Sequence, residues 1–290
     1  MQQGLAGKTI LVTGATGGIG FVAARSLAAM SATVVVVGRD PGKARATVAQ
    51  IQRDTGATAV NALTADLSSM QSVRRLAAEF QAQYPRLDVL LNNVGAVFMR
   101  RQTTVDGFER TFALNHLAPF LLTHLLLDQL KSDAPARVVT VSSMAHGGQT
   151  IDFNDVNRTG RRYSPWSAYG ESKLANIMFT YALARRLEGS GVTANTLHPG
   201  FVATGFAKNN GALWKAAMTL ARPFAISPQQ GAQTSIYLAS SPDVAAMSGH
   251  YFMKSKPAQS SKVSYDVAAQ ERLWSLSEQM TGATAPASAR

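Results

Sequence analysis

Short apolar runs alternate with longer amphipathic segments along most of the chain. The short runs have few polar positions, which is typical of parallel strands that are covered on both faces. We expect such strands at residues 8–13, 33–37, 57–63, 87–91, 136–141, 192–197 and 249–253. We expect the helices between them at residues 21–30, 41–55, 69–83, 107–130, 165–187, 228–239 and 266–281. Repeated strand–helix units of this kind predict an α/β fold, a doubly wound parallel sheet of about seven strands with helices on both faces.

Neither a linker nor an internal repeat divides the 290 residues, so we expect a single domain over residues 1–290. Residues 205–227 mix apolar and basic positions, which favours an amphipathic lid over a substrate, although a membrane-surface helix would have the same pattern. Residues 282–290 are rich in Ala, Pro and Ser and are expected to form a frayed tail.

The composition is that of a compact soluble protein, with 46% hydrophobic and 16% charged residues. The absence of cysteine excludes disulfides, thiol catalysis and cysteine-ligated metals, and the five histidines have no ligand spacing, so no metal site is expected. No apolar stretch is long enough to span a bilayer, and no secretory signal precedes the first strand. We therefore expect a cytoplasmic protein without a transmembrane segment.

The net charge of +11 raises the question of an anionic partner. The basic residues are scattered as separate pairs such as Arg100-Arg101 and Arg185-Arg186, without an arginine-rich arm or alternation with aromatic residues. This distribution argues against a nucleic-acid partner. Attraction of small anionic phosphates is the simpler explanation.

A glycine cluster, residues 13–20, separates the first expected strand from the first expected helix. A strand, a glycine turn and a helix bring backbone N–H groups and a helix N-terminus to one point, where they can bind a pyrophosphate. The alternative is an ordinary tight turn. Because both flanking elements are as expected, we favour dinucleotide binding and a Rossmann-type sheet.

The end of the second expected strand bears on the type of dinucleotide. An acidic residue there would bind an unmodified adenosine ribose. This chain has Gly38 and then Arg39, which can instead meet a 2′-phosphate, although Asp40 follows directly. Asp40-Pro41 is also a good helix start. We therefore predict NADP(H) in preference to NAD(H).

Tyr169 and Lys173 lie four residues apart in an expected helix and hence on the same face. A cation near a phenol lowers the phenol pKa from about 10 and makes it usable as an acid or base near neutral pH. The spacing is not specific in isolation, because Tyr and Lys are common on solvated helix faces.

Three more polar residues are candidates at strand ends or in helices. Pro119 cannot donate to the carbonyl of Asn115, which leaves a backbone acceptor for a bound water or marks a simple packing kink. Ser143 follows the fifth strand, where its hydroxyl could bind a substrate oxygen. Asp66 could accept from an adenine amine or act as a helix-capping carboxylate.

Taken in order, these motifs resemble the short-chain dehydrogenase/reductase family over about residues 7–280. The motifs are Thr13-Gly-x-x-x-Gly18-Ile19-Gly20, Asn92-Asn93-Val-Gly95, Ser143, Tyr169-x-x-x-Lys173 and Pro199-Gly200. The sequence is most similar to the retinol-dehydrogenase-like branch, through Phe112-Ala-Leu-Asn115-His116-Leu, Gly231-Ala-Gln-Thr-Ser and Arg272-Leu-Trp274.

The resemblance implies a reversible carbonyl reduction in which Tyr169 is the acid/base, Lys173 binds the nicotinamide ribose, and Ser143 polarises the substrate oxygen. It implies the catalytic set Asn115, Ser143, Tyr169 and Lys173. It implies as cofactor-binding residues Gly14, Thr16, Gly18, Ile19, Gly20, Arg39, Asp66, Leu67, Asn93, Gly95, Tyr169, Lys173, Pro199, Gly200, Val202 and Thr204. Gly17 departs from the family pattern, because it offers no basic side chain for a 2′-phosphate.

The expected partner is a small carbonyl or alcohol substrate of lipophilic character, and a homodimer or homotetramer is compatible with the sequence. A non-catalytic NADP(H)-binding sensor is the alternative function. A sensor would be expected to have a damaged catalytic set, and all four positions are intact here.

Overall fold

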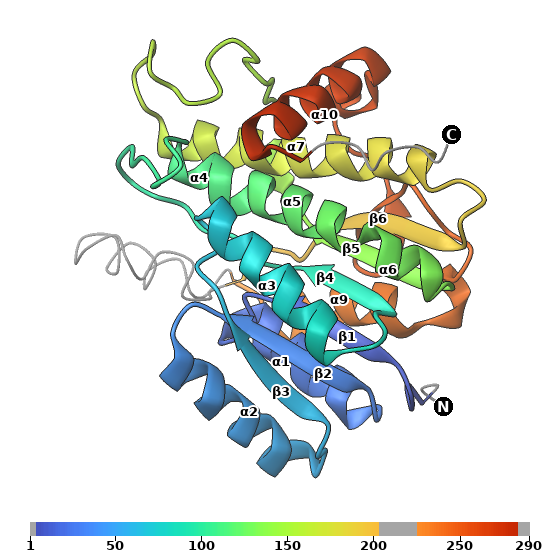
Figure 1. Ribbon diagram of the computed structural model, residues 1–290. Coiled ribbons are helices and arrows are strands. Elements are labelled where there is room, and N and C mark those ends of the chain that lie inside the picture. Colours follow the sequence, from blue (N-terminus) through green and yellow to red (C-terminus); the bar gives the residue numbers. More distant parts are fainter. Residues whose placement is uncertain (1–3, 203–224, 284–290) are drawn as a thin grey trace.

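Eight strands of the computed structural model form one sheet in the order β3-β2-β1-β4-β5-β6-β7-β8 (Figure 1). The structure describes residues 4–202 and 225–283. The strands are β1 (Thr9–Thr13), β2 (Thr33–Gly38), β3 (Val60–Thr64), β4 (Val89–Asn92), β5 (Ala136–Val141), β6 (Val192–His198), β7 (Tyr251–Met253) and β8 (Lys256–Ala258). Every pairing from β3 to β7 is parallel, and β8 pairs antiparallel with β7.

Helices cover both faces of the sheet. The long helices are α1 (Gly18–Ala29), α2 (Pro41–Thr55), α3 (Met70–Gln83), α5 (Ala118–Leu125), α7 (Pro165–Arg186), α9 (Pro228–Ser240) and α10 (Val267–Thr281). The short ones are α4 (Arg110–Phe112), the π-helical turn η1 (Ala113–Leu117), α6 (Leu127–Ser132) and the 3₁₀ turns η2 (Met144–His146), η4 (Pro242–Val244) and η5 (Lys262–Tyr265). One face carries α1, α2 and α9, the other carries α3, α5 and α7, and α10 packs on α7 and α5 (Figure 1). The predicted doubly wound α/β fold is confirmed, with element boundaries shifted by a few residues.

The expected strand count of about seven is one too low, because β8 was not predicted. Pro257 is the middle one of its three residues. Proline is compatible with a strand mainly at a sheet edge, which is where β8 lies. Lys254 and Ser255, which join β7 to β8, both have positive φ angles of 50° and 59°. A two-residue hairpin turn of this kind is normally recognised in a sequence by Asn-Gly or Asp-Gly, and this chain has Lys254-Ser255 instead.

The single helix expected over residues 107–130 is divided in the structure into α4, η1, α5 and α6, which together span residues 110–132. At the end of η1, the N–H of Ala118 donates to the carbonyl of Ala113, five residues back. Proline removes one N–H donor, and a π-helical turn is a common way to accommodate an interruption of the hydrogen-bond ladder. Pro119 therefore follows a local widening of the helix, where the sequence suggested a bend.

Several predictions lie outside the described residues. These are Thr204, residues 205–224 of the expected lid and residues 284–290 of the expected tail, so the single domain over residues 1–290 also stays a prediction. Among the residues that the structure describes, no helix is long and apolar enough to cross a membrane. Within the same ranges, no group of three or more His, Asp or Glu side chains could hold a metal ion.

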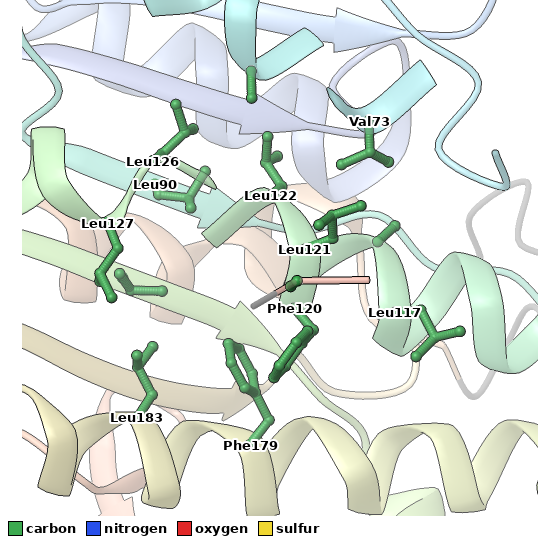
Figure 2. Packing of buried hydrophobic residues seen from close by; sticks show 14 of the residues in the cluster. Val73, Leu90, Leu117, Phe120, Leu121, Leu122, Leu126, Leu127, Phe179 and Leu183 are labelled. Atoms are coloured by element: carbon green, nitrogen blue, oxygen red, sulfur yellow. The ribbon is translucent and has the colours of Figure 1, made fainter. Parts of the chain in front are cut away.

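An aromatic cluster joins the C-terminal helix to the core. Figure 2 shows Phe120 of α5 beside Phe179 of α7, and the two ring centroids are 5.5 Å apart. The ring of Phe120 also lies 5.1 Å from that of Trp274 of α10. His116 is fully buried beside this cluster, with its ring nitrogens 3.3 Å from Asn176 Oδ1 and 2.9 Å from Ser277 Oγ. The imidazole thus links η1, α7 and α10.

Burial of His116 gives the stability of the protein a specific pH dependence. Burial lowers the pKa of His116 from 6.5 to about 4, so the folded protein holds this ring neutral. The unfolded chain binds one more proton between those two values, so the stabilisation is complete above about pH 6.5 and is lost as the pH falls towards 4. We expect a loss of roughly 3 kcal/mol from this group.

Urea unfolding between pH 4 and pH 7 measures this loss. The variant His116→Asn should be less stable at pH 7, and its stability should fall less steeply with acid than that of the unmodified protein. An identical slope in both proteins would show that His116 does not titrate as its burial requires.

Candidate active site

A cleft of about 780 Å³ opens at the carboxyl ends of the parallel strands. It spans the switch between β1 and β4, where the strand order reverses and where doubly wound sheets bind their ligands. Most predicted site residues line it: Gly14, Thr16, Gly18, Ile19, Gly20, Arg39, Asn93, Gly95, Ser143, Tyr169, Lys173, Pro199, Gly200 and Val202. The chain therefore brings together at one cleft residues that lie far apart in the sequence.

The turn between β1 and α1 forms one wall of the cleft, and its glycines are required by space and by backbone conformation. Gly14 and Gly18 have φ angles of 65° and 56°, which favour glycine. A Cβ on Gly20 would lie 2.5 Å from the Gly14 carbonyl oxygen and would overlap the Asn93 side chain. The Asn93 amide donates to the carbonyl of Thr13 at 2.9 Å, which ties this turn to the end of β4. The N-terminus of α1 is thereby exposed to the cleft and fits a pyrophosphate.

The other side of the glycine turn carries the positive charge. Arg39 and Lys43 both line the cleft. A Cβ on Gly38 would overlap the Thr16 side chain, so the position where an acidic residue could bind a ribose is already filled. Asp40 caps α2 by accepting from the Lys43 N–H at 2.8 Å, and it does not line the cleft.

Asp66 and Leu67 do not line the cleft. Oδ1 of Asp66 accepts from the backbone N–H and the hydroxyl of Ser68, at 3.0 and 2.7 Å. Burial alone would raise the pKa of Asp66. The two hydrogen bonds and the charges of Arg39 and Arg110 together outweigh burial, so the pKa is lowered. Asp66 does not cap α3, because the N-cap of that helix is Ser69, which accepts from the Ser72 N–H. The expected helix-capping role is therefore wrong, and contact with an adenine stays a prediction. Leu67 is 5% exposed and packs in the core, so only its backbone can face a ligand.

Asn115 does not line the cleft, and both the oxygen and the nitrogen of its amide are hydrogen-bonded. Its Oδ1 accepts from the Ala96 N–H at 2.8 Å, and its Nδ2 donates to the Ala96 carbonyl at 2.9 Å and to Ser172 Oγ at 2.9 Å. The side chain therefore fixes the loop after β4 against the middle of α7. A water on its carbonyl oxygen stays a prediction.

Tyr169 and Ser143 meet inside the cleft, at the first turns of α7 and at the end of β5. Burial raises the pKa of Tyr169 to about 12, and the side-chain hydrogen bond with Ser143 opposes this increase only in part. The sequence suggested a phenol pKa lowered by Lys173. In this structure burial raises the pKa instead, so Tyr169 is a protonated donor at neutral pH.

Lys173 is 2% exposed and donates from Nζ to the Val141 carbonyl at 2.9 Å. Its Nζ lies 5.7 Å from the centroid of the Tyr169 ring. A Cβ on Gly95 would lie 3.0 Å from this Nζ, so glycine leaves room for the ammonium group. Burial lowers the pKa of Lys173 to about 7. The protonation of this side chain at neutral pH therefore depends on the charge of any ligand that reaches it.

The cleft also has a lining that was not predicted. It comprises Gly17, Lys43, Val94, Val141, Ser142, Met144, Ala145, Trp166, His198 and Phe201. Some had a local signal: Trp166 precedes Tyr169 by three positions on one helix face, and His198 and Phe201 flank Pro199-Gly200. Lys43 had none, because its approach depends on how α2 packs beside α1 and the glycine turn.

Comparison with known proteins agrees with this geometry. The model of the short chain dehydrogenase family matches residues 8–213, and the chain belongs to this family. It is therefore an oxidoreductase that interconverts alcohol and carbonyl groups with a nicotinamide cofactor.

Within the family, the chain falls in the retinol-dehydrogenase-like branch. It is 41% identical to human "Retinol dehydrogenase 13" over 97% of this chain and 86% of the relative. It is 41% identical to human "Polyprenol dehydrogenase" over 95% of this chain and 85% of the relative. The solved "RhlG/NADP active-site complex" of Pseudomonas aeruginosa is 28% identical, with a TM-score of 0.69 over 86% of this chain and 95% of that chain.

Proposed function

We propose that this oxidoreductase uses NADP(H) in preference to NAD(H) and interconverts a lipophilic aldehyde or ketone with its alcohol, with Tyr169 as the acid/base. The observation that carries the proposal is the convergence of the Tyr169 hydroxyl, its hydrogen bond with Ser143 and the buried Lys173 on one cleft. These groups supply the proton that carbonyl reduction requires.

In the direction of reduction, the Tyr169 hydroxyl donates its proton to the substrate oxygen while Ser143 donates a hydrogen bond to the same atom. The nicotinamide, when bound, supplies the hydride to the carbonyl carbon. Lys173 favours the resulting phenolate by its charge. A water on the Asn115 carbonyl would complete a proton relay to solvent. In the direction of oxidation, the same groups act in reverse order.

Three features support the preference for NADP(H). Arg39 and Lys43 place two cations at the adenosine end of the cleft. The carboxylate of Asp40 is engaged in capping α2 and so does not compete for the ribose. The solved relative from Pseudomonas aeruginosa is an NADP complex by its name.

The cleft has an exposed apolar rim that supports a lipophilic substrate. Met144, Trp166 and Phe201 all line it and are 59%, 49% and 51% exposed. Large apolar side chains that remain exposed beside a catalytic group suggest that an apolar ligand covers them. Two relatives are named for the lipophilic alcohols retinol and polyprenol.

Purified protein assayed with NADPH and with NADH against pairs of carbonyl compounds tests the proposal. Each pair shares the reacting group and differs only in the length of its apolar chain. We expect NADPH oxidation, with kcat/KM rising by about tenfold for every two methylene groups that become buried. Equal kcat/KM across chain lengths would contradict the lipophilic substrate class.

The same assay separates the enzyme from a non-catalytic NADP(H) sensor. A sensor would bind NADPH, as measured by quenching of tryptophan fluorescence, but would not oxidise it with any carbonyl compound. Binding without turnover across the whole panel would therefore favour the sensor.

A further inference from the structure

One peptide group beside the catalytic serine is held at both of its ends by imidazoles. This is the group that joins Ser143 to Met144. Its carbonyl oxygen lies 2.6 Å from Nδ1 of His146, and its N–H donates to Nδ1 of His198 at 3.2 Å. The two rings come from different elements, η2 and β6, and neither contact was expected from the sequence.

The tautomer of His146 follows from its partners. A carbonyl oxygen only accepts, so Nδ1 of His146 carries a proton and donates it to Ser143. Its Nε2 accepts from the N–H of Ser261 at 3.1 Å, so this nitrogen has no proton. The ring also packs edge-on against Tyr251 of β7, with centroids 5.3 Å apart. His146 thus connects the serine turn to the C-terminal part of the sheet.

His198 needs the opposite tautomer. Its Nδ1 accepts from the Met144 N–H, so the proton of the neutral ring lies on Nε2. His198 is the last residue of β6 and lines the cleft directly before Pro199. Burial, with a smaller contribution from His146, lowers the pKa of His198 to about 4, and burial also lowers the pKa of His146. Both rings are therefore neutral at pH 7, as these contacts require.

We propose that His146 and His198 are positioning residues that together fix the plane of the Ser143–Met144 peptide group and so aim the Ser143 hydroxyl at the reacting oxygen. The role rests on the proposed function of Ser143. Neither imidazole needs to touch the substrate for it.

Two contacts make the plane of this peptide matter for catalysis. Ser143 Oγ accepts from the Ala145 N–H at 3.2 Å, which leaves the hydroxyl proton for Tyr169 or for a substrate. The same turn lies directly against α7, because a Cβ on Gly170 would overlap the Ala145 carbonyl oxygen. A rotation of the Ser143–Met144 peptide would shift Ala145 relative to the Ser143 hydroxyl that its N–H contacts, in a turn that packs against the residue next to Tyr169.

We call the two imidazoles that hold the Ser143–Met144 peptide group the clamp. Substitutions at His198 test this clamp through rescue by a conservative variant. Asparagine can place Oδ1 where the imidazole has Nδ1, whereas leucine has a similar volume and no acceptor. We expect His198→Leu to lower kcat by about tenfold, as for a lost hydrogen bond that leaves its donor unpaired. His198→Asn should restore most of that loss.

Substitutions at His146 test the other end of the peptide group, where the imidazole is the hydrogen-bond donor. His146→Asn keeps an N–H donor for the Ser143 carbonyl, and His146→Leu removes it. The exposed His250, whose Nδ1 lies 2.8 Å from the Ser248 carbonyl, provides the control His250→Leu, for which we expect no change in kcat. In every variant the dissociation constant for NADPH is measured alongside kcat. Equal kcat in the Leu and Asn variants at both positions would overturn the proposal.

Nitrogen-15 NMR of the histidine rings tests the clamp without any assay of activity. At pH 7 we expect His146 as the Nδ1–H tautomer and His198 as the Nε2–H tautomer, with each ring assigned in the unmodified protein through its bonds to its own backbone resonances. The same tautomer at both positions, or a protonated ring at either, would overturn the proposal even if a variant failed to fold. If the unmodified protein turned over no carbonyl compound, the proposed function would fail, whereas opposite tautomers would still support the clamp.

Discussion

Replacing Tyr169 by phenylalanine is expected to lower kcat by about 10²–10⁴-fold, the usual contribution of a positioned acid or base. The dissociation constant for NADPH should hardly change, because Lys173, Arg39 and the glycine turn keep their places. Phenylalanine retains the buried ring and removes only the hydroxyl. Single-turnover kinetics with NADPH and a carbonyl substrate would measure the loss in the chemical step directly.

Tyr237 provides the matched control for this substitution. It lies on α9, is partly buried in the core cluster on the opposite face of the sheet, and does not line the cleft. Tyr237→Phe should therefore leave kcat unchanged. Full activity of Tyr169→Phe would remove the central claim about the mechanism, and an equal loss in both variants would point to a general effect on the fold.

Replacing Arg39 by glutamine is expected to weaken the binding of NADPH by about 10- to 100-fold, the range for a lost hydrogen bond to a charged group. The binding of NADH should change little, because NADH lacks the 2′-phosphate that Arg39 would contact. The preference for NADPH should thus shrink or vanish. Titration of both cofactors by fluorescence at fixed ionic strength gives the two dissociation constants.

Arg45 separates a specific contact from a general effect of charge. It is an exposed residue of α2, two positions after Lys43, and it does not line the cleft. Arg45→Gln removes the same charge and should change neither dissociation constant. A preference of the unmodified protein for NADH, or equal effects of the two arginine substitutions on NADPH, would reject the role of Arg39.

The sheet and the pyrophosphate turn could be predicted because their signals are local. Strand β2, Thr33–Gly38, contains four consecutive valines, and such a continuous apolar run is typical of a strand that is buried on both faces. Gly14 and Gly18 adopt left-handed conformations within a few residues of β1, so their function depends on their immediate neighbours. The spacing of Tyr169 and Lys173 is likewise a property of one helix.

Other features could not be predicted, because they depend on contacts between distant segments. Tyr169 carries no sign in the sequence that burial would raise its pKa to about 12, since the elements that bury it come from several parts of the chain. The approach of Lys43 to the cleft depends on how α2 packs beside α1 and the glycine turn. The hydrogen bonds of the Asn115 amide with Ala96 and Ser172 join three segments that the sequence shows as independent.

The order of strands and helices, the glycine turn and the pairing of a tyrosine with a lysine thus follow from residue patterns, since periodicity and backbone preference act over a few positions. The electrostatics of the site and the exact placement of Ser143 do not. They arise when β5, β6, α7 and the β7–β8 hairpin come into contact, because desolvation and hydrogen-bond geometry depend on which atoms become neighbours in space.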